Sequence, residues 1–202
     1  MSVAGLVLAA GGGRRFGAPK ALLTRADGRR YVDHAVASVR DGGCDPVVVV
    51  VGAAGESVRE HLAAAPVRIV DCPTWAQGMG ESLRAGLAAL DDLAVNAAVV
   101  TLVDLPDVGS DVVVRLVAAS SANGPSAPSA RSALVRAAYG GRPGHPVVLG
   151  RDHWSGIREM AEGDRGARDY LATHPHRTVE CGDLATGRDV DTPQDLMDDS
   201  GA

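Results

Sequence analysis

Residues 6–23 read LVLAAGGGRRFGAPKALL, in which a short apolar run leads into three glycines, two arginines and then Lys20. Lys20 is the only lysine of the chain, and the other 19 of the 20 basic residues are arginines. An apolar run that stops at glycines predicts a strand and then a turn, where backbone amides can approach a ligand without hindrance from Cβ atoms. Successive exposed N–H groups form an anion-binding nest, so we expect this loop to bind an anionic ligand.

Two common phosphate-binding motifs do not fit the loop. The dinucleotide fingerprint needs G-x-G-x-x-G, whereas the third glycine falls one position late, at Gly17, and no acidic residue follows at a suitable strand end. A P-loop needs Gly-Lys-Ser/Thr at the start of a helix, but Pro19 precedes Lys20 and Ala21 follows it. From these residues alone, an ordinary glycine turn with solvated arginines remains an alternative.

The composition predicts one domain over residues 1–202, because 202 residues with 46% hydrophobic content can form a sizeable core. The net charge of −5 argues against a broad nucleic-acid surface, which would be basic. No apolar run approaches the ~18 residues of a membrane span, and the first residues lack the pattern of a signal peptide. Three widely spaced cysteines without a C-x-x-C pair favour a reducing, cytoplasmic setting: Cys44, Cys72 and Cys181.

The hydrophobic pattern predicts an α/β fold. Strand-like runs cover residues 3–9, 46–51, 67–70, 97–103, 133–138 and 146–149. Helical spacing of apolar residues covers residues 32–40, 57–64, 82–93, 155–161 and 167–173. This alternation favours a three-layer fold with a mostly parallel sheet and Rossmann-like topology. Ligands of such sheets bind beyond the carboxyl ends of the strands.

Three segments lack a regular pattern. Residues 120–133 are rich in Ser, Ala, Gly and Pro, and we expect a flexible surface loop there. Residues 140–146 read GGRPGHP and are predicted to be irregular. Residues 197–202 are predicted to form a frayed tail.

Carboxylates follow a predicted strand and occupy a later extended segment. Asp104 comes directly after the run at residues 97–103, at the sheet edge where ligands bind. Asp189 and Asp191 are two residues apart, so in an extended segment their side chains share a face. Mg²⁺ usually takes one or two carboxylates plus substrate phosphates. Turn or helix capping by these aspartates is the alternative, although Thr192 before a proline is itself a good N-cap.

The order Leu8-Ala9-Ala10-Gly11-x-Gly13-x-Arg15-x-Gly17-x-x-Lys20 resembles the signature of the MobA-like NTP-transferase family. The resemblance extends from residue 6 to about residue 196 and implies a nucleotidyltransferase topology. In that family the glycine loop wraps the phosphates of the nucleotide, while the Arg and the Lys neutralise charge at the reacting α-phosphate. The resemblance therefore implies that the nucleotide-binding residues of the loop are Leu8, Ala9, Ala10, Gly11, Gly13, Arg15 and Lys20.

Both carboxylate segments also resemble the family. Its members carry Asp-x-Pro after the corresponding strand and Asp-Ile-Asp-Thr-Pro-Glu-Asp near the C-terminus, where residues 189–195 here read DVDTPQD. The strand-end Asp of the family holds Mg²⁺, which implies that Asp104 is a metal ligand and acts in catalysis with Lys20 and Arg15. Asp191 is the next metal candidate, and Asp189 is a weaker one.

Two further segments concern the base and the acceptor. Residues 71–87 resemble the Asn-Pro-x-Trp-x-x-Gly-x-x-x-Ser segment of the family, which implies that Gly78 and Ser82 bind nucleotide. Cys72 replaces the usual Asn, and we expect Trp75 to be a packing residue. The stretches GRPGHPVVL and GDRGAR are typical of the branch that resembles molybdenum cofactor cytidylyltransferases. They imply acceptor-binding roles for Arg142, His145, Arg165 and Arg168. The alternatives are that the histidine is structural and that the arginines are solvated.

The expected activity is transfer of a nucleoside monophosphate from an NTP to a phosphorylated acceptor, with release of pyrophosphate and with Mg²⁺ as cofactor. CTP is favoured over GTP, and molybdopterin is the expected acceptor. Transient contact with molybdoenzyme maturation proteins is a further expectation. The alternatives are a guanylyltransferase, a transferase for another small phospho-acceptor, and a non-catalytic protein that binds or delivers a nucleotide or cofactor.

Overall fold

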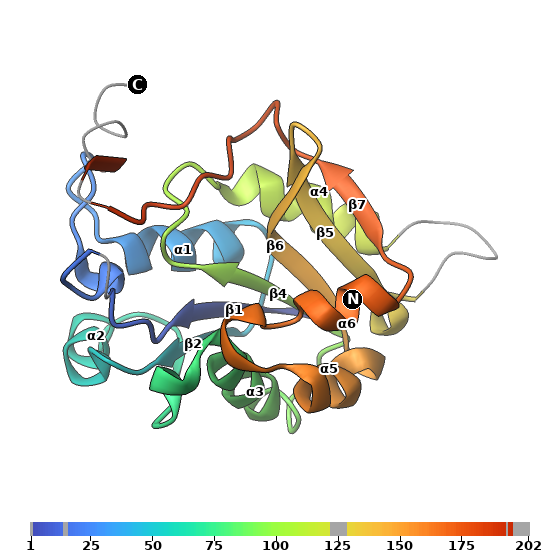
Figure 1. Ribbon diagram of the computed structural model, residues 1–202, viewed down its shortest axis with the longest axis horizontal. Coiled ribbons are helices and arrows are strands. Elements are labelled where there is room, and N and C mark those ends of the chain that lie inside the picture. Colours follow the sequence, from blue (N-terminus) through green and yellow to red (C-terminus); the bar gives the residue numbers. More distant parts are fainter. Residues whose placement is uncertain (1, 14–15, 122–128, 193, 196–202) are drawn as a thin grey trace.

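The computed structural model describes residues 2–13, 16–121, 129–192 and 194–195. Within these residues a seven-stranded sheet lies between two layers of helices (Figure 1). The strands follow the spatial order β3-β2-β1-β4-β6-β5-β7. Their bounds are β1 Val3–Ala9, β2 Val47–Val51, β3 Arg68–Asp71, β4 Ala97–Leu102, β5 Leu134–Tyr139, β6 Arg142–Gly150 and β7 Arg177–Glu180.

The sheet is mixed but mostly parallel. β1 pairs in parallel with β2 and β4, so that Leu8 lies opposite Val50 on one side and Leu102 on the other. β3 and β7 extend the sheet in parallel, and β6 is antiparallel to both of its neighbours, β4 and β5. The predicted α/β fold with a mostly parallel sheet is confirmed. The carboxyl ends of β1 and β4 lie side by side, which brings together the segments that follow them.

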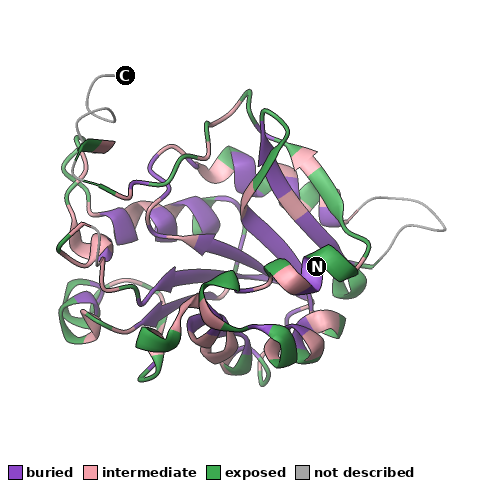
Figure 2. Cartoon of the chain, viewed as in Figure 1, coloured by how far each residue is buried: buried purple, intermediate pink, exposed green. Residues whose placement is uncertain are grey.

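Helices cover both faces of the sheet, and the central strands β1, β2 and β4 are almost entirely buried (Figures 1 and 2). One face packs against α1 Tyr31–Asp41, α2 Gly55–His61 and α4 Ser110–Ser120. The other packs against α3 Met79–Ala89, α5 Trp154–Met160 and α6 Arg168–Thr173. Short 3-10 helices are η1 Lys20–Leu22, η2 Trp75–Gln77, η3 Ala130–Ser132, η4 Arg151–His153 and η5 Gly163–Arg165.

All six predicted strands are present, but the expectation for residues 140–146 is wrong. Residues 142–146 form the first part of β6 rather than an irregular segment. The reason is a tight turn at Gly140 and Gly141, whose φ angles are 57° and 76°, a region that glycine adopts without strain. Their N–H groups donate to the carboxylate of Glu180, which fixes the turn between β5 and β6.

The sequence prediction did not include α4 or β7. β7 lies at the edge of the sheet with three of its four residues exposed, so it lacks an apolar signal. In α4 the consecutive valines at 112–114 obscure the helical spacing of the buried residues. Of the loop predicted at 120–133, residues 122–128 lie outside the described residues, as does the predicted tail at 197–202. No helix in the described part of the chain is both long and apolar enough to span a membrane.

Helix α3 approaches the sheet closely at Gly86. A Cβ atom at this position would lie 2.5 Å from Leu6 Cδ1 and 3.0 Å from Val50 Cγ2, closer than normal van der Waals contact. Leu6 and Val50 are themselves fully buried, so neither side chain has room to move. The missing side chain at Gly86 therefore sets the distance between α3 and the sheet.

We expect Gly86→Val to lower the free energy of unfolding by about 2 kcal/mol or more, because overpacking of a filled core costs about 1–3 kcal/mol. Chemical denaturation measures the loss. The matched control is Ala88→Val, which places the same side chain at an exposed position of the same helix. It should cost no more than the difference in helix propensity, up to about 0.7 kcal/mol. Equal losses in the two variants would contradict the packing argument.

Candidate active site

The glycine loop leaves β1 in a conformation that depends on Gly13. This residue has a φ of 59°, and a Cβ atom on it would lie 1.8 Å from the carbonyl oxygen of Ala18. The Gly13 carbonyl accepts a hydrogen bond of 2.7 Å from the Gly17 N–H, which closes the turn. Gly12 lies against the indole ring of Trp75, with no space for a side chain between them. The backbone of the loop is thus held close to its neighbours.

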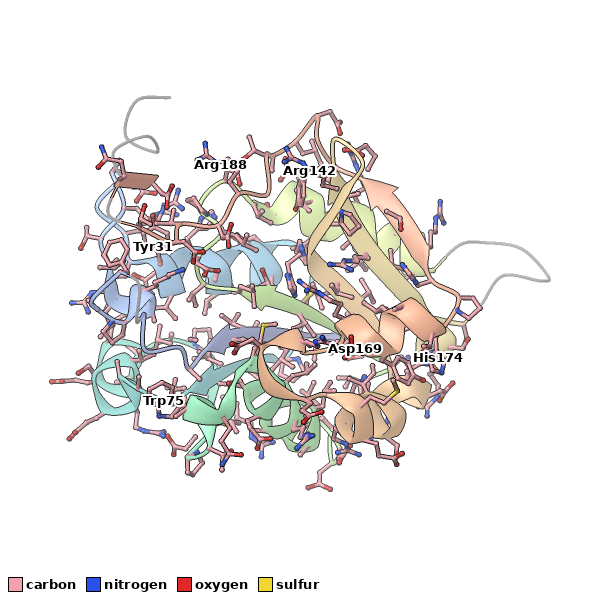
Figure 3. The ribbon with its side chains drawn as sticks, viewed as in Figure 1. Tyr31, Trp75, Arg142, Asp169, His174 and Arg188 are labelled. Atoms are coloured by element: carbon pink, nitrogen blue, oxygen red, sulfur yellow. The ribbon has the colours of Figure 1, made fainter. Side chains whose placement is uncertain are left out.

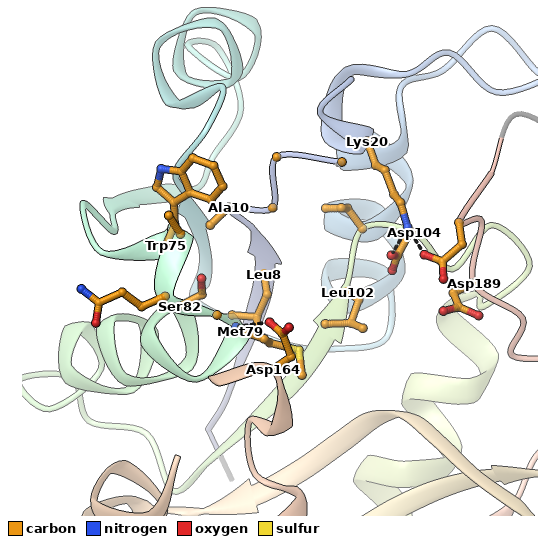
Figure 4. Close-up of a pocket in the computed structure, with 18 of the residues that line it drawn as sticks. Leu8, Ala10, Lys20, Trp75, Met79, Ser82, Leu102, Asp104, Asp164 and Asp189 are labelled. Atoms are coloured by element: carbon orange, nitrogen blue, oxygen red, sulfur yellow. Dashed lines mark hydrogen bonds and ion pairs between the residues drawn. The ribbon is translucent and has the colours of Figure 1, made fainter. Parts of the chain in front are cut away.

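The ammonium of Lys20 lies between two carboxylates (Figure 4). Its Nζ is 2.9 Å from Asp104 Oδ2 and 2.6 Å from Asp191 Oδ1. The Lys20 side chain is 13% exposed and that of Asp104 is 19% exposed, so solvent screens this pair weakly, whereas Asp191 is 38% exposed. The three residues come from η1, from the segment after β4 and from the segment after β7, which are far apart in the sequence. The fold brings together the lone lysine and two of the predicted metal ligands.

Backbone hydrogen bonds hold the two carboxylate segments against each other. The Val190 N–H donates to the Asp104 carbonyl at 2.9 Å, and Val190 is buried. The Asp195 carboxylate accepts from the N–H groups of Asp191 at 3.0 Å and Thr192 at 2.7 Å. The Thr192 hydroxyl donates to the same carboxylate at 2.8 Å. These bonds fix the backbone on both sides of Asp191.

Burial and mutual charge set the protonation of this group. Burial by itself would lower the pKa of Lys20, but the carboxylates of Asp104 and Asp191 outweigh it, and the pKa is raised. Burial raises the pKa of Asp104, and the Lys20 charge opposes that rise only in part. The nearby charge of Asp189 raises the pKa of Asp104 further. The Lys20 ammonium therefore stays charged and is the cation that holds these acidic groups together.

The carboxylate pair suits a divalent cation that binds together with a substrate. Oδ1 of Asp104 is buried and has no hydrogen-bond partner among the described residues, which leaves a free oxygen ligand. The same part of the chain holds no group of three or more His, Cys, Asp or Glu side chains placed to bind one metal ion. Mg²⁺ commonly takes one or two protein carboxylates and completes its shell with water and phosphate oxygens. Asp104 and Asp191 fit that pattern, and they do not form a cage from protein alone.

A cleft of about 760 Å³ opens beyond the carboxyl ends of β1 and β4, within the size range of small-molecule sites. Leu8 and Leu102 lie along its floor, between a wall that carries Trp75 and the wall that carries Lys20 and Asp104 (Figure 4). Of the predicted nucleotide-binding residues, the cleft is lined by Leu8, Ala10, Gly11, Gly13, Lys20, Gly78 and Ser82. Ala9 faces the opposite side of the sheet, and Arg15 lies outside the described residues.

The four predicted acceptor residues are not brought together. Arg168 lines the cleft, and His145 lines a small adjacent cavity. Arg142 is exposed near the tip of the β5–β6 hairpin (Figure 3). Arg165 is exposed and pairs with Asp169, 3.1 Å away on α6. Arg142 and Arg165 line neither cavity, so only half of the predicted set faces a candidate binding site.

The cleft also contains residues that the sequence prediction left out. Gly12, Gln77, Met79 and Asp164 line it, and so does Trp75, which we expected only to pack. Trp75 does both: ring atoms Cη2 and Cζ3 lie against Gly12, and the residue also lines the cleft. Its place in a segment that resembles the family was the signal that pointed to it. Asp164 belongs to the GDRGAR stretch, of which the prediction included only the two arginines.

Comparison with known proteins identifies the family. A curated relative from Paenarthrobacter nicotinovorans, named nicotine blue oxidoreductase, is 38% identical over 96% of this chain and 94% of its own length. The crystal structure of a mycobacterial Rv0371c homologue, from strain JC1, has a TM-score of 0.77 and 27% identity, and the match covers 97% of this chain and 93% of that one.

A Mycobacterium tuberculosis Rv0371C structure in complex with manganese shares the fold, with a TM-score of 0.76 and 23% identity over 99% of this chain and 98% of that one. The MobA-like NTP transferase domain matches residues 5–179. The chain belongs to the MobA-like NTP transferase family.

Proposed function

We propose that this protein transfers a nucleoside monophosphate from an NTP to a small phosphorylated acceptor and releases pyrophosphate. The observation that carries the proposal is the contact of the Lys20 ammonium with Asp104 and Asp191 in the cleft that the glycine loop also lines. A triphosphate needs both donors and cations, and this cleft offers loop amides, one buried ammonium and a carboxylate pair for a divalent ion.

The reaction is an in-line displacement that uses no protein nucleophile. An oxygen of the acceptor phosphate forms a bond to the α-phosphorus of the NTP while the bond from that phosphorus to the bridging oxygen breaks, and pyrophosphate leaves with that oxygen. The loop amides from Gly11 to Gly13 position the phosphates, and Lys20 stabilises the charge that develops during transfer. A divalent ion, Mg²⁺ or the manganese seen with the mycobacterial relative, would neutralise further phosphate charge when held by Asp104 and Asp191.

We further propose that the nucleotide is CTP and that the acceptor is molybdopterin. The resemblance of the GRPGHPVVL and GDRGAR stretches to molybdenum cofactor cytidylyltransferases favours CTP and molybdopterin over GTP and other phospho-acceptors. Transient contact with molybdoenzyme maturation proteins would follow from that acceptor. A preference for GTP in the assay below would change the base without changing the chemistry.

A reductase is the second candidate, favoured by the name of the 38% identical relative. In that case the cleft would hold a reduced nicotinamide nucleotide, and transfer of a hydride from it with uptake of a proton would reduce the second substrate. The absence of G-x-G-x-x-G in the loop counts against a dinucleotide. A reductase also has no evident need for the Lys20–carboxylate group.

We expect the purified protein to release pyrophosphate from one NTP in the presence of Mg²⁺ and molybdopterin. Lys20→Ala should lower kcat/KM by about 10²–10³-fold, because it removes a cation aimed at the reacting phosphate. Arg59→Ala is the control, since it removes an exposed pair with Asp71 outside the cleft and should change the rate less than twofold. A second assay tests the reductase alternative: it follows the absorbance of NADH or NADPH with an oxidised dye as electron acceptor. Consumption of NADH or NADPH without pyrophosphate release would establish the reductase instead.

Metal binding should depend on Asp104 more than on its neighbour Asp189. Electron paramagnetic resonance of Mn²⁺ in the presence of nucleotide should show affinity about tenfold weaker or worse for Asp104→Asn, since a buried oxygen ligand is lost. Asp189→Asn changes the same charge in the same cleft, but Asp189 makes no contact with Lys20, and the affinity should fall less than about threefold. Equal losses would show that the metal responds to overall charge only.

Nucleotide binding should depend on the conformation at Gly13. Gly13→Ala introduces a Cβ that overlaps the Ala18 carbonyl, so the loop must change shape and nucleotide affinity should fall at least tenfold. Quenching of Trp75 fluorescence reports binding, because Trp154 is buried away from the cleft. Gly28→Ala is the control: its φ of 82° carries the same backbone strain, but its Cβ meets no other atom within 4 Å. An equal loss of nucleotide affinity in both variants would mean that the overlap at Gly13 does not cause the loss.

A further inference from the structure

A cationic group lies beside the cleft on the part of the sheet formed by β5 and β6. Arg136 is half-buried in the middle of β5 and lies opposite Val147 of β6. His145 precedes Val147 by two residues, and the two side chains line the same small cavity. Leu8 and Val147 belong to a single apolar cluster beneath α3, α5 and α6. Arg136 Nε donates to the Gly144 carbonyl at 3.3 Å, which holds it next to His145.

The position of His145 connects this group to the nucleotide cleft. His145 lines a small cavity together with Gly166 and Ala167, the two residues before Arg168. Leu8 and Met79 line this small cavity and also the main cleft, and Arg168 lines the main cleft. The charge of Arg168 lowers the pKa values of both Arg136 and His145. Arg168 therefore lines the cleft away from Lys20, His145 lines the cavity next to it, and Arg136 lies behind them beside His145.

Arg136 and Arg168 are not neutralised by protein. Neither guanidinium has a carboxylate within 4.0 Å in the described part of the chain, whereas Arg165, three residues before Arg168, is paired with Asp169. Burial and the Arg168 charge both lower the pKa of Arg136. Burial, with the charges of the two arginines, lowers the pKa of His145 to about 4, so its imidazole is neutral at neutral pH. Arg136 is half-buried and Arg168 is exposed. A half-buried charge next to a like charge costs stability unless an anion accompanies them.

We propose that Arg136, Arg168 and His145 form an anion subsite that binds the phosphate group of the acceptor. The inference rests on the proposed function, in which the acceptor attacks through a phosphate oxygen. Each guanidinium can donate two N–H groups to the oxygens of a phosphate dianion. A neutral imidazole adds one more hydrogen bond without adding charge. Arg136 is outside the motifs that pointed to the other two residues. Arg136 adds a second guanidinium to that of Arg168, so the proposed subsite has two cationic groups.

The test uses inorganic phosphate as the probe, titrated into the ligand-free protein by calorimetry and by thermal unfolding. Arg136→Gln and Arg168→Gln should each weaken phosphate binding at least tenfold and abolish the rise in Tm that phosphate gives the wild type. In phosphate-free buffer Arg136→Gln should have a Tm equal to or above that of the wild type, because it removes an unneutralised charge. A purely structural arginine would give a lower Tm.

Three controls separate this subsite from the triphosphate site. Arg165→Gln removes an arginine from the same short segment that is already paired with Asp169, and it should leave phosphate binding unchanged. Gly13→Ala should leave the Arg136-dependent phosphate binding in place while it weakens nucleotide binding. Acetate replaces phosphate in a parallel titration and should bind at least tenfold more weakly, because it carries a single charge.

Several results would overturn the inference. Phosphate affinity unchanged by both Arg136→Gln and Arg168→Gln would show that the group is not an anion site. An equal loss of nucleotide and phosphate affinity would place these residues at the triphosphate, and acetate binding as tight as phosphate would exclude a dianion subsite. The titrations need no turnover. A protein that binds phosphate through Arg136 but releases no pyrophosphate would therefore contradict the proposed function and not this subsite.

Discussion

The central constraint in this protein is that one buried ammonium holds two carboxylates in place. Lys20 lies within 3 Å of both Asp104 and Asp191, and all three come from different parts of the chain. Without the lysine, two carboxylates would repel each other in a partly buried place, and without them an ammonium would be buried unpaired. The three segments are therefore stable in this arrangement only together, and this arrangement forms one wall of the cleft.

Charge is distributed unevenly along the cleft, and this follows from which strands contribute to it. The acidic side chains follow β4 and β7, where the Val190 N–H binds the Asp104 carbonyl. Arg136 belongs to β5 and Arg168 to α6, and of these two arginines Arg168 lines the cleft. The cleft therefore carries a Lys20–carboxylate group that suits a divalent cation and, separately, an arginine that suits an anion.

The sequence predicted the central strands well because they are buried on both faces. The five valines of β2 and the apolar run of β1 indicate strands buried on both faces. A strand covered by helices on both sides needs apolar residues throughout. The edge strand β7 and the first residues of β6 were missed. Their exposed residues carry no periodic apolar signal, and backbone pairing with β5 makes them strands.

The sequence by itself determined the glycine loop, the lone lysine and the aspartates, because a long motif fixes residue types at fixed spacing. Only the tertiary structure decided which arginines face the cleft: Arg168 lines it, whereas Arg165 is engaged by Asp169 and Arg142 is exposed near a hairpin tip. Arg136 belongs to no motif, and it lies beside His145 because β5 pairs with β6 and its Nε donates to the Gly144 carbonyl. Strand register and helix placement are long-range properties, so local spacing could not distinguish a binding arginine from a solvated one.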